Sequence, residues 1–530
     1  MESKSRLGPG LIIAGSIVGS GELIATTKTG AQAGIVLLWL IIIGCLIKVF
    51  VQIELGRYAI GHGETTLAAL DRVPGPHITL WRMPGGDYLA ANWIVWCWLA
   101  MMLLGIGQLG GIVGGVGQAI ALSAPMTGDY AEAILVPSQK EIERFIKWDD
   151  DINKNGRKEF SKLTNPQQKR ILRGQEVFRQ QLAGIQTTHG DVVATVRSGE
   201  TLEDPYTWDD KIWAALVALL TAGLLYRGRY RLIQNISTVL VVAFTFITIG
   251  NVIALQTTEQ WHISLSQFLD GVSFRLPEAT GGIDPLATAM ATFGIIGVGA
   301  AELITYPYWC LEKGYAKFTG KRTDDESWAR RARGWMKVMR YDAFASMAVY
   351  TTATLAFFLM GVAVLHNEGR DPDGMRMVST LARAYVPVFG EYARWLFLGG
   401  AVAVLYSTFL VATAGNARMY TDAVKIYGLM DHNNPRHHDR AVSSFSVVLP
   451  FLCLAVFCTG VNPVRTILVA GFMQGILLPM VGAGALYFRY TRTDGRIKPG
   501  RLWDVLLILS FIGLFIAGSY IGYTKISALF

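Results

Sequence analysis

The sequence predicts an all-α polytopic membrane protein with eleven transmembrane helices. Of its 530 residues, 52% are hydrophobic and 17% are charged, and the mean hydropathy is +0.35. Soluble proteins carry about 25% charged residues. Apolar runs long enough to cross a bilayer recur along nearly the whole chain. The runs are near-continuous rather than alternating, which excludes a membrane β-barrel as well as a soluble enzyme.

Each span is expected where an apolar run of about 20 residues lies between polar or charged segments. In chain order the predicted spans cover residues 8–29, 33–58, 90–122, 212–227, 233–256, 285–312, 342–365, 393–416, 442–459, 464–488 and 503–523. The first ten form two halves of five helices, and the eleventh is an extra helix.

Positive charge is concentrated on one side of these spans. The segments on the side of the N-terminus hold more than half of the 48 Lys and Arg residues, notably in 227–231 and 313–340. The positive-inside rule therefore predicts a cytoplasmic N-terminus and an outside C-terminus, in a bacterial inner membrane. The net charge of +8 then faces the lipid bilayer, and no nucleic-acid partner is expected.

One polar and charged segment, residues 126–208, separates the third and fourth spans and is expected on the outside as an inserted domain. The predicted division of the chain is 1–125 for helices one to three, 126–208 for the insert, 209–256 for helices four and five, 257–341 for helix six with its flanking loops, and 342–530 for helices seven to eleven.

The insert contains a pattern that resembles a calcium-binding loop between two helices. Asp151, Asn153 and Asn155 stand at the first, third and fifth positions of an EF-hand loop. Its twelfth position is Lys162 instead of a glutamate, so Glu159 would have to serve as a ligand in a shortened loop. The pattern leaves open a Ca²⁺ site or a solvated capping turn. No other cofactor is expected.

A short repeat marks the candidate transport site. Residues 18–24 read VGSGELI and residues 298–304 read VGAAELI, in predicted helices one and six. Both segments place small residues and a carboxylate in mid-span, and these helices lead the two halves. Because each half has an odd number of helices, the halves have opposite orientations. Such inverted repeats are typical of secondary transporters, whose broken first helices form the substrate site.

Glu22 and Glu302 are the carboxylates of this repeat. A carboxylate near the bilayer centre costs about 2.5–3.5 kcal/mol, so each should line a hydrated cavity or hold a cation. The alternative is a helix-end glutamate that accepts hydrogen bonds from freed backbone N–H groups. Glu54 is expected to pair with Arg57 three residues on, and Asp284 and Asp342 are expected to start helices.

The chain resembles the Nramp family of divalent-metal transporters. The resemblance rests on GPG at residues 8–10, ST at 407–408, TAGN at 413–416 and Gln474 followed by LLP at 477–479. It implies a leucine-transporter-like fold with broken helices one and six. The metal-binding motifs depart from the family pattern. Residues 19–22 read GSGE where the family has DPGN, and residues 299–302 read GAAE where the family has MPHN.

These departures replace the family's aspartate, thioether and histidine by small residues and glutamates. An all-oxygen donor set favours a hard cation such as Mg²⁺ or Mn²⁺. The predicted ion ligands are Glu22, Glu302 and Gln474, and the predicted substrate-binding residues are Gly19, Gly21, Glu22, Gly299, Ala300, Glu302, Thr408 and Gln474. Helices three and nine carry no Asp, Glu, Lys, Arg or His within 92–122 and 441–459, so we expect transport by alternating access without proton coupling.

Two alternatives remain open from the sequence. The glycine-rich segment is similar to the break of amino-acid permeases, whose freed N–H groups bind a carboxylate, so the substrate could be a small organic solute. A non-transporting sensor with the insert as its ligand-binding part is the second alternative. An enzyme is not expected, because no nucleophile motif is present. The sequence leaves the oligomeric state open.

Overall fold

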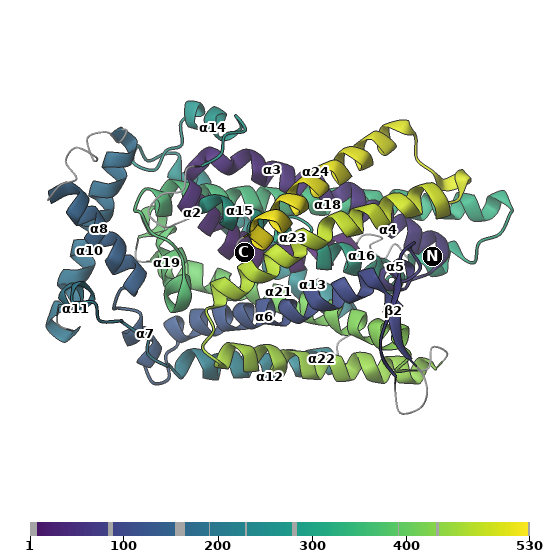
Figure 1. Cartoon of the computed structure of the whole chain (residues 1–530), viewed down its shortest axis with the longest axis horizontal. Helices are drawn as coiled ribbons and strands as arrows, with labels where there is room; N and C mark the ends of the chain where they lie inside the picture. The colour runs from purple at the N-terminus through teal and green to yellow at the C-terminus, as the bar shows by residue number, and fades with distance from the viewer. Residues whose placement is uncertain are drawn as a thin grey trace.

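The computed structural model describes residues 8–82, 88–153, 165–189, 191–227, 230–277, 284–390, 392–430 and 434–527. Long helices run side by side along the molecule, and short helices gather at one end (Figure 1). A two-stranded hairpin lies toward the opposite end. We call these ends the insert end and the hairpin end.

The first part of the chain forms the helices that enter and leave the bundle centre. Its elements are α1 (Pro9–Ile17), η1 (Ser20–Thr26), α2 (Thr27–Ala33), η2 (Gly34–Leu37), α3 (Leu38–Leu46), α4 (Lys48–His62), α5 (Thr66–Leu70), β1 (His77–Arg82), β2 (Tyr88–Asn92) and α6 (Trp93–Ser123). The strands pair antiparallel, His77 opposite Asn92. Asn92 then caps α6 by accepting a hydrogen bond of 3.2 Å from the Ile94 N–H.

The polar insert is helical and leads into two further long helices. Its elements are α7 (Asp129–Ala133), α8 (Gln139–Asn153), α10 (Asn165–His189) and α11 (Val192–Arg197), followed by α12 (Asp209–Arg227), α13 (Tyr230–Leu255) and α14 (Leu265–Gly271). A small separate core of Ile142, Ile185 and Val192 holds the insert helices together.

The remaining elements complete the bundle. They are α15 (Pro285–Ile295), α16 (Ala300–Glu312), α17 (Tyr315–Thr319), α18 (Glu326–Met360), η3 (Gly361–His366), η4 (Gly374–Arg376), α19 (Met377–Arg383), α20 (Val386–Phe389), α21 (Tyr392–Ile426), α22 (Pro435–Cys458), α23 (Pro463–Tyr487), η5 (Phe488–Arg492), η6 (Gly495–Ile497) and α24 (Arg501–Ser527). Proline begins α1, α15, α22 and α23, where its missing N–H needs no partner.

Small residues let the helices pack closely, as expected where lipid supplies no hydrophobic driving force between helices. A side chain on Gly110 of α6 would place its Cβ 2.8 Å from the Cys453 carbonyl of α22. A Cβ on Gly294 of α15 would overlap the Gly471 carbonyl of α23. Both glycines are therefore required by close backbone approach.

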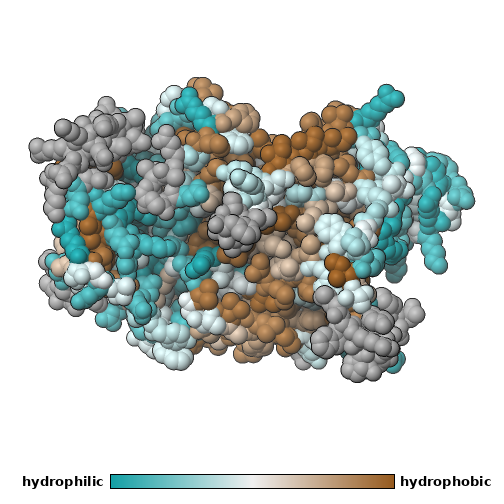
Figure 2. All heavy atoms as spheres, in the orientation of Figure 1, coloured by the Kyte–Doolittle hydropathy of each residue, from teal (hydrophilic) through white to brown (hydrophobic). Residues whose placement is uncertain are grey.

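Hydrophobic residues form a band across the middle of the visible face, and hydrophilic residues gather toward both ends (Figure 2). Nine stretches of the described residues are long and apolar enough to cross a membrane. The first, Ile12–His62, spans 51 residues, which at 1.5 Å per residue is enough for two crossings. The protein is an integral membrane protein.

The predicted number of eleven spans is not confirmed. The predicted span 212–227 falls within α12, which carries Asp209, Asp210, Lys211 and Arg227 and is not among the nine. The packing of α12 against α6 and α22 places it within the bundle, and the count of eleven stays a prediction.

The predictions made for three charged residues, Glu54, Asp284 and Asp342, can be compared with the structure. Glu54 and Arg57 pair at 3.1 Å, and Asp284 caps α15 by accepting from the Ala287 N–H at 3.0 Å, as expected. The helix-start role predicted for Asp342 is wrong for its own helix, because Asp342 lies inside α18. Its carboxylate accepts hydrogen bonds from the Gly8 and Gly10 N–H groups and so anchors the start of α1.

Candidate functional site

The first predicted helix is broken in mid-span. Helix α1 ends at Ile17, and η1 begins at Ser20 after two residues outside helical geometry. Gly19 has φ −165° and ψ −120°, and a Cβ at this position would overlap the Thr408 side chain of α21. The η1 segment is π-helical, a form that is frequent at functional sites.

The sixth predicted helix is broken at the matching place. Helix α15 ends at Ile295, and α16 begins at Ala300. Gly297 adopts φ 60°, a conformation that side chains disfavour and glycine allows. Both breaks were expected, near 18–22 and 298–302 within the repeat. The first, at 18–19, lies inside the expected segment, and the second, at 296–299, begins two residues before it.

A cavity lies between the two breaks and helices α6, α21 and α23. Its lining comprises Ser16, Ile17, Ser20, Gly21, Met101, Met102, Gly105, Gln108, Leu109, Ile112, Ile295, Ala301, Glu302, Thr408, Ala412, Asn416 and Gln474. Four predicted site residues are among them: Gly21, Glu302, Thr408 and Gln474. The structure therefore brings together residues from four separate parts of the sequence.

Glu302 supplies the carboxylate of the cavity. Its side chain is half-buried, and the Ser16 hydroxyl donates to Oε1 at 3.4 Å. Gln474 Oε1 accepts from the Ala301 N–H at 3.3 Å, which caps the start of α16. The Gln474 amide also donates to Gln108 Oε1 at 3.0 Å. Carboxylate, amide and hydroxyl oxygens thus meet at the break of the sixth helix.

Glu22 has different surroundings. It is fully buried and is not among the residues that line the cavity. Its Oε2 accepts from the Gly19 N–H at 3.3 Å, and its Oε1 accepts from the Thr354 hydroxyl at 3.3 Å. This is the helix-end arrangement that the sequence left open as an alternative. Glu22 therefore stabilises the break through its hydrogen bonds, away from the cavity.

The other predicted residues also divide into two groups. Thr408 lines the cavity, and its hydroxyl oxygen lies 3.3 Å from the Gly15 carbonyl and 3.4 Å from the Val18 carbonyl. Gly19, Gly299 and Ala300 do not line the cavity. A Cβ on Gly299 would lie 2.5 Å from both Gln474 Oε1 and Glu302 Oε2, so this glycine makes room for the two polar side chains.

Sequence reasoning missed Ser16 and Gln108, which lack charge and sit among apolar residues. It also missed Lys48, which is fully buried at the start of α4. Its ammonium group donates to the Phe293 carbonyl at 2.5 Å and the Ile296 carbonyl at 2.7 Å, at the break of the sixth helix. The available signal was a lysine inside the apolar run 35–51.

The cavity extends toward the hairpin end. Its lining includes Met101 and Gly105, which belong to the part of α6 nearer the hairpin, and Asn416, which lies two turns beyond Thr408 along α21. Helix α6 begins directly after β2, and Asp422 near the end of α21 accepts a hydrogen bond from the Thr65 hydroxyl, just before α5.

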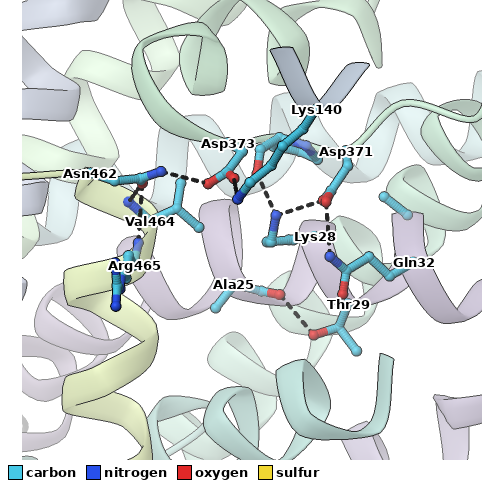
Figure 3. A network of polar contacts seen from close by, with 12 residues as sticks. Ala25, Lys28, Thr29, Gln32, Lys140, Asp371, Asp373, Asn462, Val464 and Arg465 are labelled. Carbon is cyan, nitrogen blue, oxygen red and sulfur yellow. Dashed lines mark hydrogen bonds and ion pairs between the residues drawn. The ribbon is translucent and has the colours of Figure 1, made fainter. Parts of the chain in front are cut away.

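A polar network joins elements of the bundle to the insert (Figure 3). Lys28 of α2 pairs with Asp371 at 2.7 Å and donates to the Pro372 carbonyl at 2.9 Å. Asp373 accepts from the Asn462 amide at 3.0 Å and lies 3.5 Å from the Lys140 amine of the insert. The network therefore joins α2, the segment after η3, α23 and the insert.

The surroundings of Asp373 favour its charged form. Burial disfavours the carboxylate of Asp373, but Lys28, the Asn462 amide and Lys140 outweigh burial and hold the pKa of Asp373 below its usual range. A lowered pKa stabilises the charged form, so this contribution is lost only as the pH falls below the ordinary range of an aspartate.

The predicted calcium loop is only partly described. The backbone of Asp151 and Asn153 belongs to the last turn of α8, while Asn155 and Glu159 lie outside the described residues. Within the described ranges, no group of three or more His, Cys, Asp or Glu side chains could hold a metal ion. The calcium site stays a prediction.

Two broken helices that meet at a polar cavity in the middle of an apolar bundle are typical of secondary transporters built from inverted repeats. The family profile described as natural resistance-associated macrophage protein-like, or Nramp, matches residues 176–524, more than half of the chain. The chain belongs to the Nramp family, which comprises transporters of divalent metals rather than enzymes. The matched residues begin after the first helix, so the role of residues 19–22 rests on the geometry above.

Solved structures share the fold at low sequence identity. A single-residue variant of the Eremococcus coleocola manganese transporter has a TM-score of 0.56 and 15% identity, over 96% of this chain and 84% of that chain. The same transporter in complex with an aromatic bis-isothiourea substituted compound has a TM-score of 0.55 and 15% identity, again over 96% of this chain and 84% of that chain. MhsT in complex with L-phenylalanine has a TM-score of 0.50 and 15% identity, over 99% of this chain and 98% of that chain. A search of curated proteins finds no match.

Proposed function

We propose that this protein carries a hard divalent cation, such as Mg²⁺ or Mn²⁺, across the membrane by alternating access and without moving protons. The observation that carries the proposal is the set of oxygen donors at the cavity. Glu302, Gln474, Gln108, Ser16 and Thr408 present carboxylate, amide and hydroxyl oxygens there. Hard cations prefer such oxygen ligands, whereas softer transition metals favour imidazole and sulfur.

The ligand roles are assigned by position. Glu302 neutralises part of the ion's charge, and Gln474 and Thr408 contribute neutral oxygens. Glu22 acts at longer range, because it is buried behind the break and bonded to Gly19 and Thr354. The sulfur atoms of the cavity belong to Met101 and Met102, about two turns of α6 before Gln108.

The conformation fits one stage of alternating access. The Lys28 network closes the insert side, while the cavity extends toward the hairpin end. In the orientation predicted from the Lys and Arg distribution, the ion site in this state communicates with the cytoplasmic side.

The organic-solute alternative has less support from the geometry. A substrate carboxylate would need free N–H groups at the break of the first helix. The Gly19 N–H is already taken by Glu22 at 3.3 Å. This hydrogen bond leaves a carboxylate substrate one donor fewer at the break.

Calorimetry on the purified protein separates the two substrate classes. We expect saturable binding of Mg²⁺ or Mn²⁺ that is weakened in Glu302→Gln and retained in the control Glu326→Gln, at the exposed start of α18. Binding of an amino acid with no binding of either cation would contradict the proposal.

A further inference from the structure

Lys48 is a buried charge that the proposed transport cycle does not yet use. It is fully buried and is the first residue of α4, within the stretch Ile12–His62 that is apolar enough to cross a membrane. An ionisable residue at this depth is costly and marks a functional site by default. Lys48 is not among the residues that line the cavity, so it is not itself an ion ligand.

The contacts of Lys48 lie at the break of the sixth helix. Its ammonium group donates to the Phe293 carbonyl at 2.5 Å and to the Ile296 carbonyl at 2.7 Å. It also lies 4.8 Å from the centre of the Phe293 ring. A helix leaves its last four carbonyls without partners inside the helix, and its C-terminal end carries partial negative charge. Lys48 satisfies two of these carbonyls and offsets that charge.

The break is packed directly against the segment that carries Lys48. A Cβ on Gly297 would lie 3.0 Å from Cys45 Cα, at the end of α3. The charge of Lys48 also interacts with those of Glu302 and Glu22. One fixed cation therefore acts on both carboxylates of the repeat and on the end of α15.

We propose that Lys48 is a positioning residue of the transport site, which fixes the break of the sixth helix and lowers the net negative charge that a bound divalent cation meets. This inference rests on the proposed transport of a divalent cation. The ammonium group of Lys48 offsets part of the negative charge at the site, so the loaded site releases its ion more readily. Without Lys48, the site attracts the ion more strongly and holds it longer.

The test is uptake of Mn²⁺ or Mg²⁺ by proteoliposomes containing Lys48→Met, Lys48→Gln or Lys48→Arg. We expect both uncharged variants to show a KM about tenfold lower and a kcat about tenfold lower, the size of an ordinary coupling between sites. Lys48→Arg keeps the charge and should retain both constants. A purely structural role would instead lower the folded yield and raise KM or leave it unchanged, and that result would overturn the proposal.

Two further variants test whether the effect on KM is specific to Lys48 and depends on its charge. Arg57→Met removes another buried cation of α4, whose partner is Glu54 and not the site, and should leave KM unchanged. Glu22→Gln combined with Lys48→Met removes one acidic and one basic group, whose effects on KM should oppose each other, so its KM should lie closer to wild type than that of either single variant. If all three KM values coincide, the charge argument is wrong.

The failure of the inference can be told from the failure of the proposed function. Absence of cation uptake by the wild-type protein contradicts the proposed function. Normal wild-type uptake with an unchanged KM in Lys48→Met and Lys48→Gln contradicts only the role of Lys48.

Discussion

Glu22 and Glu302 stand at the same position of the repeated segment, but the fold gives them different roles. Glu302 is half-buried beside the cavity, near Gln474 and Ser16. Glu22 is fully buried and accepts hydrogen bonds from Gly19 and Thr354. A direct contact with the ion is therefore expected for Glu302, and a longer-range electrostatic contribution is expected for Glu22.

Neutralising either carboxylate should weaken cation uptake, and Glu302→Gln should do so more strongly. Removing the charge that faces the ion is expected to raise KM by about tenfold, which corresponds to about 1.4 kcal/mol. Glu22→Gln should cause a smaller rise, because Glu22 does not line the cavity and the glutamine oxygen can still accept from the Gly19 N–H. Initial uptake rates over a range of Mn²⁺ concentrations measure the KM of both variants. Wild-type kinetics in both would show that neither carboxylate contributes to cation binding.

Gln474→Leu should disturb both the donor set and the start of α16. The substitution removes the acceptor of the Ala301 N–H and the donor to Gln108. An unsatisfied buried partner costs about 1–3 kcal/mol, so we expect KM to rise by about tenfold with the protein still folded. Gln474→Glu, which keeps the acceptor, is the matched comparison. Equal KM values in wild type and Gln474→Leu would exclude a ligand role.

The repeat was sufficient to find Glu22 and Glu302 from the sequence, because a carboxylate beside small residues is rare inside a membrane span. Which of the two faces the cavity depends on the rotation of each half-helix after its break, which the pattern does not encode. Lys48 was missed because one lysine barely changes the hydropathy of the run 35–51.

At the scale of elements, both helix breaks were predictable, since glycine has a low helix propensity and a carboxylate inside a membrane span needs polar partners. The residues at which the breaks begin were harder to predict. The first break occurs where Thr408 of α21 approaches Gly19. The second occurs where the Lys48 ammonium group donates hydrogen bonds to the carbonyls of Phe293 and Ile296. Both causes are tertiary contacts between residues distant in the sequence.

The Lys28 network gives a prediction at this scale. Lys28→Met removes the ion pair with Asp371 and the donor to the Pro372 carbonyl, so closure of the insert side should weaken. A cysteine at Thr29, which is buried in α2, should then be labelled by a water-soluble thiol reagent several times faster than in the presence of Lys28. Lys140→Met, which removes only the 3.5 Å contact to Asp373, is the milder comparison. Equal labelling in all three would show that the network does not hold this side closed.

For the whole molecule, the membrane bundle followed from composition and apolar runs alone, and the Nramp resemblance is confirmed over residues 176–524. The number of spans was harder to predict, since α12 combines a span-like length with charged ends. How the insert contacts the bundle could not be predicted, because contacts such as that between Lys140 and Asp373 join segments more than 200 residues apart.

Transport should not acidify the vesicle lumen. Among the described residues that line the cavity, Glu302 is the titratable side chain, and a bound divalent cation favours its charged form. A pH-sensitive dye inside liposomes should therefore report no change during an imposed Mg²⁺ or Mn²⁺ gradient. Acidification that follows cation entry and is absent in Glu302→Gln would show that Glu302 carries a proton.

The central claim is that a divalent cation crosses the membrane through the cavity at Glu302. Its most direct test is the flux of Mg²⁺ and Mn²⁺ into liposomes containing wild type, Glu302→Gln or the exposed control Glu326→Gln. The account predicts saturable entry down the gradient, about tenfold slower at low cation concentration in Glu302→Gln and unchanged in the control. Entry at the same rate in Glu302→Gln as in wild type, or no entry of either cation, would contradict it.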